Sequence, residues 1–385
     1  MKSLPDEDDA GAWLKSNPLR DFAAAKGRPP SLPSYQLNLD RVSMPVPRLL
    51  RYALKLIGVS SAGPGEKVEW WSNFTYKGEW CELSHQKFGL RLRLGTLRAE
   101  NEAQATLRQI AKQLTASVRT VEKVILQAAP ELLGEGSATV VNQHDSLTRA
   151  YQYFRDGASD PTLIEDEVTT YEPGDGMILR ATTFSSGQIL MSMNAFHDLV
   201  AAISAYLSRL EHDLILFLPF TGFDPELDNV TDIIGTRWGD KFDRVLGKST
   251  DALRFKQRLT DVVERWRNPY SHGGFEKGHG ATIYLHAPGV GAVPIGLSSV
   301  RNSPRFSFIP AGESDIAQVF ELFDELDAWM TQEHPEATCW IESGLDLRFD
   351  PGFRTELAES RSTDSFDKFL ANWEHRQAVV DNMDY

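Results

Sequence analysis

The chain has 385 residues, of which 41% are hydrophobic and 24% are charged. This composition suits two or three folded domains and excludes a disordered or fibrous protein. A formal net charge of -14 argues against a protein that coats nucleic acid, because such binding needs many Lys and Arg contacts to phosphates, although it leaves room for a local basic pocket.

Membrane and metal sites receive no support from the sequence. No run of about 18 apolar residues occurs, and the first residues, MKSLPDEDDAGAW, are acidic and polar where a signal peptide would be basic and then apolar. We therefore expect a cytoplasmic protein with no membrane contact. The two cysteines, Cys81 and Cys339, lie outside any CxxC spacing, so we expect no disulfide framework, no metal and no cofactor.

The N-terminal half is predicted to contain an arm and a mixed domain. Residues 1–40 have no sustained apolar period and are expected to form a flexible arm with one short helical stretch at 19–25. Residues 41–185 are expected to form an α+β domain for recognition or regulation. It begins with a helix in PRLLRYALKLIGV and continues with strands in VEWWSNFTYKGEW, CELSH and FGLRLRLG. The aromatic residues of these strands are expected to be hairpin core rather than RNA-stacking groups.

A long amphipathic helix is predicted between residues 100 and 133. Its apolar face consists of Leu107, Ile110, Leu114, Val118, Val121 and Ile125. The segment QIAKQLTASVRTVEKVI also resembles a helix-turn-helix, which would read DNA through residues 107–126. Because the apolar period continues through the supposed turn and no glycine stands there, we favour a single helix and keep a DNA-binding regulator as the least favoured alternative.

Residues 190–385 are predicted to form a mainly helical domain. Asn194 is a candidate cap for a long helix that Pro219 would end. Further helices are expected in TRWGDKFDRVLG, STDALRFKQRLTDVVERWRN, SDIAQVFELFDELDAWM and FDKFLANWEHRQAVV. Strands in ATIYLH, GAVPIGL and RFSFI would form a small β insertion at about 281–309. The fold class is therefore α+β, a helical bundle with a β insertion preceded by an N-terminal α/β domain.

One short segment, RNPYSH, combines residue types that could cleave RNA. It holds Arg267, Asn268 and His272 at the end of a predicted helix. An arginine, a polar residue and a histidine at this spacing, with a long helix containing YLSRLEHDLILF about 55 residues upstream, resemble the signature of the HEPN superfamily of small helical bundles. The resemblance covers roughly residues 190–335 and does not extend to the N-terminal half.

The HEPN resemblance implies metal-independent cleavage of RNA by a homodimer in which the motifs of two protomers face each other. The chemistry of the residues is compatible with that reaction. A neutral His272 can exchange protons with the 2′-hydroxyl and the leaving oxygen. Arg267 offers a permanent, bidentate charge for the phosphate oxygens, and Asn268 can orient either group. The expected product carries a 2′,3′-cyclic phosphate.

Neighbouring residues are expected to position this motif. Pro269 should break the helix and move Asn268 away from helical angles, so that both side chains reach one surface. Glu211 and His212 on the upstream helix are candidates for contacts that set the tautomer of His272. Tyr270 and Ser271, directly before the histidine, are further candidates for such contacts.

Two alternatives to a nuclease remain open. Arg267 and His272 could serve only the end of a helix, or the domain could be an inactive HEPN-like module for dimerisation or sensing. By analogy with the family, the setting would be a toxin or an antiviral defence system with an antitoxin or another defence partner. Gly274 stands where one toxin branch has a modifiable tyrosine, so regulation by nucleotide transfer is not expected.

Overall fold

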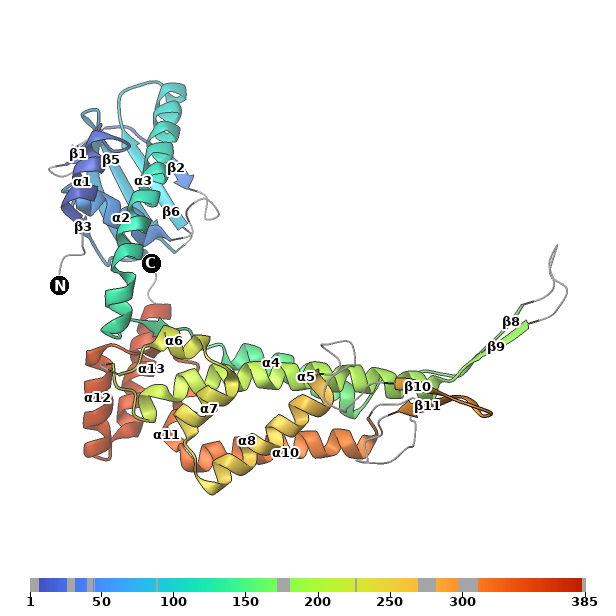
Figure 1. Ribbon diagram of the computed structural model, residues 1–385. Helices are drawn as coiled ribbons and strands as arrows, with labels where there is room; N and C mark the ends of the chain where they lie inside the picture. Colours follow the sequence, from blue (N-terminus) through green and yellow to red (C-terminus); the bar gives the residue numbers. More distant parts are fainter. Residues whose placement is uncertain are drawn as a thin grey trace. The chain divides into compact units, whose positions relative to one another are not determined.

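The protein is described from a computed structural model that covers residues 7–25, 32–39, 44, 46–87, 89–171, 181–225, 227–268, 282–296 and 311–382. The chain forms two compact units, the first from residues 1–134 with 372–385 and the second from residues 135–371. A sheet dominates the first unit and helices dominate the second (Figure 1). The mixed α/β class predicted from the sequence is therefore confirmed at this level.

The first unit is built on an antiparallel sheet whose strands follow the order β1-β4-β5-β6-β2, with the short β3 beside β4. The strands are β1 (Phe22–Ala24), β2 (Ser34–Leu39), β3 (Ser61–Ala62), β4 (Val68–Tyr76), β5 (Glu79–Gln86) and β6 (Gly89–Gly95). Lys77 and Gly78 join β4 to β5 in a two-residue turn, and both have positive φ angles. A glycine at the second position suits this turn, because a side chain there would be strained.

One face of the sheet is covered by α1 (Glu7–Ser16), α2 (Pro47–Leu56) and α3 (Glu100–Gly134) (Figure 1). Along β4 the side chains of Trp70, Phe74 and Tyr76 are buried against these helices, whereas Trp71 and Thr75 alternate with them. This period of two is what a sheet with one buried face requires. The predicted strands and the predicted core role of most of these aromatic residues are confirmed.

The flexible arm predicted for residues 1–40 is wrong for the parts that the structure describes. Leu14 and Leu19 have no exposed surface, and Phe22 and Leu39 are more than nine-tenths buried in the same core. Strand β1 pairs with β4 and β2 pairs with β6, at opposite edges of the sheet. These partners lie far along the chain, so a local apolar period could not reveal them.

Helix α3 is continuous from Glu100 to Gly134, which confirms the single helix and removes the turn that a helix-turn-helix would need. Leu107, Ile110, Leu114 and Val121 are fully buried on one side of it. The chain passes into the second unit after Gly134. The predicted boundary near residue 185 therefore lies inside that unit, where α4 (His144–Ser159) packs on α5 (Gly187–Phe217).

The second unit is mainly helical. Besides α4 and α5 it contains η1 (Leu218–Phe220), α6 (Val230–Gly235), α7 (Trp238–Leu246), α8 (Thr250–Val262), η2 (Val263–Arg267), α10 (Glu313–Glu333), α11 (Pro335–Glu342), α12 (Pro351–Ser362) and the first residues of α13 (Phe366–Asn382). The short strands β7 (Thr139–Val140) and β12 (Leu347–Arg348) pair with each other. The rings of Tyr206 on α5 and Phe323 on α10 stack with centroids 3.7 Å apart, at the centre of the bundle.

Two hairpins extend the second unit, β8 (Glu167–Tyr171) with β9 (Ala181–Ser185) and β10 (Thr282–Ala287) with β11 (Gly291–Gly296). The second hairpin is the predicted β insertion as far as residue 296, and the RFSFI segment lies outside the described residues. No helix in the described ranges is long and apolar enough to cross a membrane.

The long helix α5 starts earlier than predicted. Asn194 is not its cap, because the helix begins at Gly187, whose N–H donates to Asp166 Oδ1 at 2.8 Å. A Cβ at position 187 would lie 1.9 Å from the carbonyl oxygen of Ile164, so only glycine allows the chain to pass there. Pro219 stands in the 3-10 turn that follows the helix, close to its predicted end.

Candidate functional site

The Arg267 motif follows a helix that changes geometry before it ends. Helix α8 begins after Ser249, whose hydroxyl accepts a hydrogen bond from the N–H of Ala252 at 3.2 Å. From Val263 to Arg267 the chain forms a π-helical turn, and the N–H of Asn268 donates to the carbonyl of Val263, five residues earlier. The next residue is Pro269, which has no N–H to offer and whose ring needs space at the preceding turn. The wider π turn fits that requirement.

Asn268 keeps helical angles, with φ -65° and ψ -46°. The prediction that Pro269 moves this residue out of the helical region is therefore wrong. The preference of a residue before proline for extended angles is a statistical and steric tendency, and Asn268 does not follow it. The regular α-helix ends at Val262, and the π-helical turn begins at Val263, before the proline.

The two arginines of this turn have different surroundings. Arg265 forms an ion pair with Asp315 on α10 at 2.9 Å, and its guanidinium lies 4.3 Å from the ring centroid of Trp266, which is itself buried. Arg267 is exposed and has no acidic partner among the described residues. No described residue neutralises its permanent charge, whereas the charge of Arg265 is used within the fold.

His272 lies outside the described residues, as do Pro269, Tyr270, Ser271 and Gly274. The pairing of Arg267 with His272 at one site therefore stays a prediction. Of the RNPYSH motif, the structure places Arg267 and Asn268, side by side at the end of the π turn. Their turn packs against α5, the helix that carries Glu211 and His212.

Glu211 and His212 both have partners in the second unit. The carboxylate of Glu211 accepts a hydrogen bond from Lys241 Nζ at 2.7 Å, and Lys241 is buried. His212 Nε2 accepts from the backbone N–H of Gln143 at 3.0 Å, so its other ring nitrogen carries the proton. Burial lowers the pKa of His212. The structure thus gives both residues a role in joining α5 to its neighbours.

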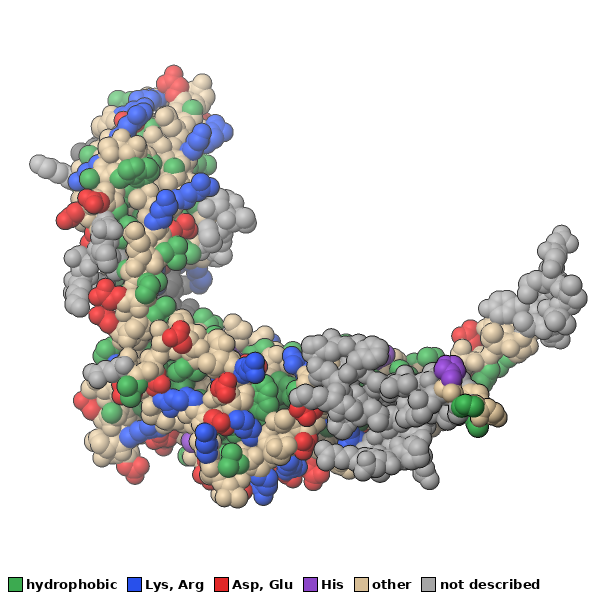
Figure 2. Space-filling model, viewed as in Figure 1, with side chains coloured by type: hydrophobic (Ala, Val, Ile, Leu, Met, Phe, Trp, Pro, Cys, Tyr) green, Lys and Arg blue, Asp and Glu red, His purple; other side chains and the backbone are tan. Residues whose placement is uncertain are grey.

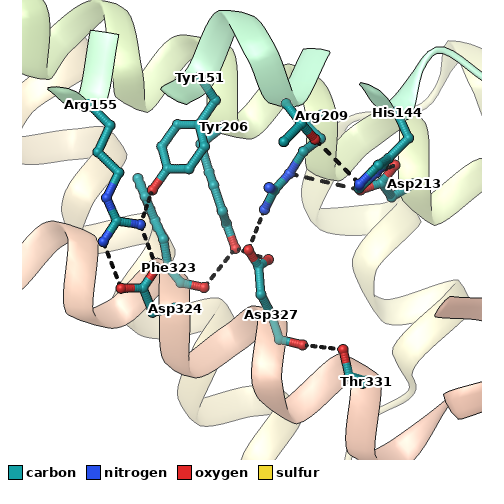
Figure 3. Close-up of polar contacts among 11 residues, drawn as sticks. His144, Tyr151, Arg155, Tyr206, Arg209, Asp213, Phe323, Asp324, Asp327 and Thr331 are labelled. Atoms are coloured by element: carbon teal, nitrogen blue, oxygen red, sulfur yellow. Dashed lines mark hydrogen bonds and ion pairs between the residues drawn. The ribbon is translucent and has the colours of Figure 1, made fainter. Parts of the chain in front are cut away.

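A buried polar network joins α4, α5 and α10 (Figure 3). At its centre is Arg209, whose side chain is only 8% exposed and which forms an ion pair with Asp327. The hydroxyl of Tyr206 donates to the same carboxylate at 2.9 Å. The guanidinium also lies 4.8 Å from the ring centroid of Tyr206. A charge this deeply buried is costly unless paired, so these contacts are required for α5 and α10 to pack.

Two further pairs flank Arg209 on the α4 side of the network (Figure 3). Arg155 binds Asp324 through both terminal nitrogens, at 2.5 and 2.7 Å, and also donates to the hydroxyl of Tyr151. His144 Nδ1 lies 3.0 Å from both oxygens of Asp213. Burial by itself would lower the pKa of His144, but hydrogen bonding to Asp213 and the charge of that carboxylate outweigh burial and raise it.

Sequence reasoning missed this network, although a signal existed. Arg209 and Asp213 stand four residues apart on the helix that is most apolar in the chain, and Asp327 interrupts the apolar period of α10. Charged residues at otherwise buried positions indicate paired ions. The burial of Arg209 and Asp213 fits a scaffold role rather than contact with substrate.

No group of three or more His, Cys, Asp or Glu side chains with the arrangement of a metal site occurs in the described part of the chain. Comparisons with protein-family models, with curated proteins and with solved structures give no match. The functional reading therefore depends on the chemistry of the residues themselves.

Proposed function

We propose that the chain is a metal-independent endoribonuclease of the HEPN type, with Arg267, Asn268 and His272 as its site residues. The observation that supports the proposal best is the exposed guanidinium of Arg267, which has no acidic partner among the described residues and stands at the end of a π-helical turn in an otherwise acidic unit. Short π segments within helices occur frequently at functional sites. An unpaired arginine there is suited to hold a phosphate diester.

In the proposed reaction His272 takes the proton from the ribose 2′-hydroxyl, which then attacks the adjacent phosphorus. The bond to the 5′-oxygen breaks, and that oxygen receives the proton from the imidazolium of His272 as it leaves. Arg267 binds the non-bridging oxygens, whose negative charge increases in the transition state. Asn268 orients the phosphate or the imidazole. The products are a 2′,3′-cyclic phosphate and a 5′-hydroxyl, and no step requires a metal or a cofactor.

The proposal includes a homodimer in which two motifs form one active site, and a setting in toxin or antiviral defence with an antitoxin or defence partner. Both parts come from the HEPN resemblance. Sedimentation of the purified chain tests the dimer directly, because a protomer of 43.2 kDa and its dimer differ twofold in mass.

The decisive experiment compares wild type with Arg267→Ala and His272→Ala in the cleavage of total RNA and a tRNA pool in EDTA, with analysis of product ends. Arg254→Ala is the matched control, since Arg254 is an exposed arginine of α8 that forms an ion pair with Asp251 one turn away. We expect wild type and the control to leave cyclic phosphate ends. Loss of Arg267 should slow cleavage by about 10²- to 10³-fold, the usual effect of removing one transition-state contact. Cleavage at the wild-type rate by Arg267→Ala would refute the proposal.

A catalytically inactive interaction module is the second candidate, and the β8–β9 hairpin favours it. Val168 and Phe184 face each other across the two strands, and each is 63% exposed. A two-stranded hairpin is marginally stable alone, so an exposed apolar pair on it suits contact with another protein. If purified wild type leaves RNA intact while Phe184→Ser changes its oligomeric state, this second reading replaces the nuclease.

A further inference from the structure

The two units of the chain carry net charges of opposite sign. The first unit, residues 1–134 with 372–385, contains 20 Lys and Arg against 17 Asp and Glu, a net charge of +3, while the second unit, residues 135–371, contains 20 against 37, a net charge of -17. The first unit is thus basic within an acidic protein. A localised excess of cations attracts an anionic partner even when the whole chain repels it.

Four of these cations lie on the outer side of α3. Taking about 100° of rotation per residue, Arg108, Lys112, Arg119 and Lys123 point between about 140° and 200° from the buried Ala103. They therefore face directly away from the sheet. All four side chains are exposed, and none has an acidic partner among the described residues. Between positions 108 and 123 the only acidic residue is Glu122.

Helix α2 packs beside α3 on the same face of the sheet and adds two cations. Arg51 and Lys55 are exposed and lie about 100° and 140° around the helix from the buried Leu50. Arg48 also faces outward, but its charge is paired with Glu69 at 3.0 Å. Lys and Arg side chains gather on this side of the first unit in Figure 2. We call the six cations Arg51, Lys55, Arg108, Lys112, Arg119 and Lys123 the basic face.

We propose that the basic face binds the phosphate backbone of RNA and so docks the substrate of the proposed nuclease. From Arg108 to Lys123 the helix rises by about 22 Å. Over that length one strand of a duplex presents about six phosphates, so a row of exposed cations can contact several at once. The choice of RNA over DNA rests on the proposed function, because phosphate contacts alone carry no base information.

An RNA backbone fits this face better than a membrane does. The apolar sides of α2 and α3 are buried in the core of the sheet, so neither helix can insert into a bilayer. Single cations distributed along a straight helix match the regular charge of a polynucleotide. The acidic second unit of another copy of the chain is the other polyanion that could bind the basic face. The binding experiment separates this possibility from RNA binding.

The test measures binding of a labelled RNA hairpin by the full chain carrying His272→Ala, so that cleavage does not consume the probe. A second protein, the α3 variant, also has Gln in place of Arg108, Lys112, Arg119 and Lys123. Gln has a helix propensity similar to that of Lys and Arg, so these substitutions on an exposed helix face should preserve the fold. The matched control is the His272→Ala protein in which Gln replaces four exposed cations of the second unit, namely Arg149, Arg237, Lys248 and Arg254. Both variants lose four positive charges, and thermal unfolding checks that both are folded.

We expect the α3 variant to bind on the order of a hundredfold more weakly at 50 mM salt, and its dependence of log affinity on log salt to be shallower by up to about 3.6. The control should match its parent in slope. Equal binding by the α3 variant and its parent would overturn the inference, as would absence of RNA binding at 50 mM salt. Tighter binding to a DNA hairpin of the same sequence, or to phosphatidylserine vesicles, would overturn the choice of RNA.

Self-association of the parent at low salt that the α3 variant abolishes, without RNA binding, would assign the basic face to a second copy and also overturn the proposal. The docking site and the nuclease can fail separately. If wild type cleaves RNA and the α3 variant binds RNA as tightly as its parent, only the docking proposal is overturned. If the basic face binds RNA in a salt-dependent way but wild type does not cleave RNA, only the proposed nuclease function is overturned.

Discussion

Neighbouring residues of one type have different roles in this chain, and their surroundings decide which. Arg265 and Arg267 lie on one π turn, yet the first is paired with Asp315 and the second is exposed. The RNPYSH motif singled out Arg267 from the sequence, but neither its exposure nor the pairing of Arg265 could be read there, since Asp315 lies 50 residues further on. Arg209 was missed for the same reason, because its partner Asp327 is on another helix.

The geometry of the guanidinium at position 267 should matter as well as its charge. Lysine keeps the charge but lacks the planar pair of donors that fits two phosphate oxygens. We therefore expect Arg267→Lys to cleave RNA at least about tenfold more slowly than wild type, but faster than Arg267→Ala. Single-turnover rates with excess enzyme measure this directly. Equal rates for wild type and Arg267→Lys would mean that only a point charge is needed.

The buried network should respond unequally to the loss of its acidic members. Asp327→Ala leaves Arg209 buried without its main partner, and removing one member of a buried pair typically costs about 3–5 kcal/mol. Because the Asp327 side chain is 36% exposed, we expect the lower end of that range. Asp324→Ala breaks the more exposed pair with Arg155 and should cost about 1 kcal/mol or less. Urea unfolding measures both, and equal losses would contradict a special role for Arg209.

Elements with a sustained apolar period were predicted well, and those that depend on distant partners were not. The period on α3 identified one continuous helix, and alternation identified the strands of the sheet. Strands β1 and β2 are short and pair across the unit, so the sequence around them looked like an arm. The start of α5 was misplaced because Asn194 is a good capping residue in general, whereas the close approach of Gly187 to Ile164 is visible only in three dimensions.

The stability of the contacts between α4 and α5 should depend on pH through two histidines, His144 and His212, whose pKa values are shifted in opposite directions. The folded pKa of His144 is raised, so its stabilising contribution is complete below about pH 6.5, its unfolded pKa, and is lost as pH rises through the raised value. The folded pKa of His212 is lowered, so its contribution is present above about pH 6.5 and is lost as pH falls through the lowered value.

Unfolding by urea at pH 5.5 and at pH 8.5 separates the two histidines. We expect His144→Gln to destabilise the protein more at the lower pH, because the hydrogen bond and the charge of Asp213 raise the pKa of His144 and so favour its protonated form in the folded state. His212→Gln should have the opposite trend, since it removes a group that resists protonation when buried. The same pH trend for both substitutions would contradict the pKa directions assigned to them.

At the scale of the whole molecule, sums over the full chain conceal differences between its units. The net charge of -14 disfavours extensive nucleic-acid binding, but it combines a basic first unit with an acidic second unit. The division itself could not be located from the sequence, because α4 was expected to belong with the preceding strands. Its packing on α5 depends on contacts such as that of Tyr151 with Tyr206, between residues 55 positions apart.

Each unit has its own hydrophobic core, and this predicts two unfolding transitions for the full chain. The core of the first unit is built from residues between Leu14 and Val121. In the second unit α5 and α10 bury their own apolar faces. Separate cores allow separate cooperative unfolding, so a single free energy of unfolding would not describe the protein.

One substitution in each core assigns the transitions. Leu107 and Leu210 are almost fully buried, on α3 and α5 respectively, and replacing a buried leucine by alanine costs about 2–5 kcal/mol. Scanning calorimetry of Leu107→Ala should lower one transition temperature and leave the other unchanged, and Leu210→Ala should do the reverse. If both substitutions shift a single transition by similar amounts, the two cores unfold as one, and the basic unit must then be treated as part of the same cooperative fold as the helices that carry Arg267.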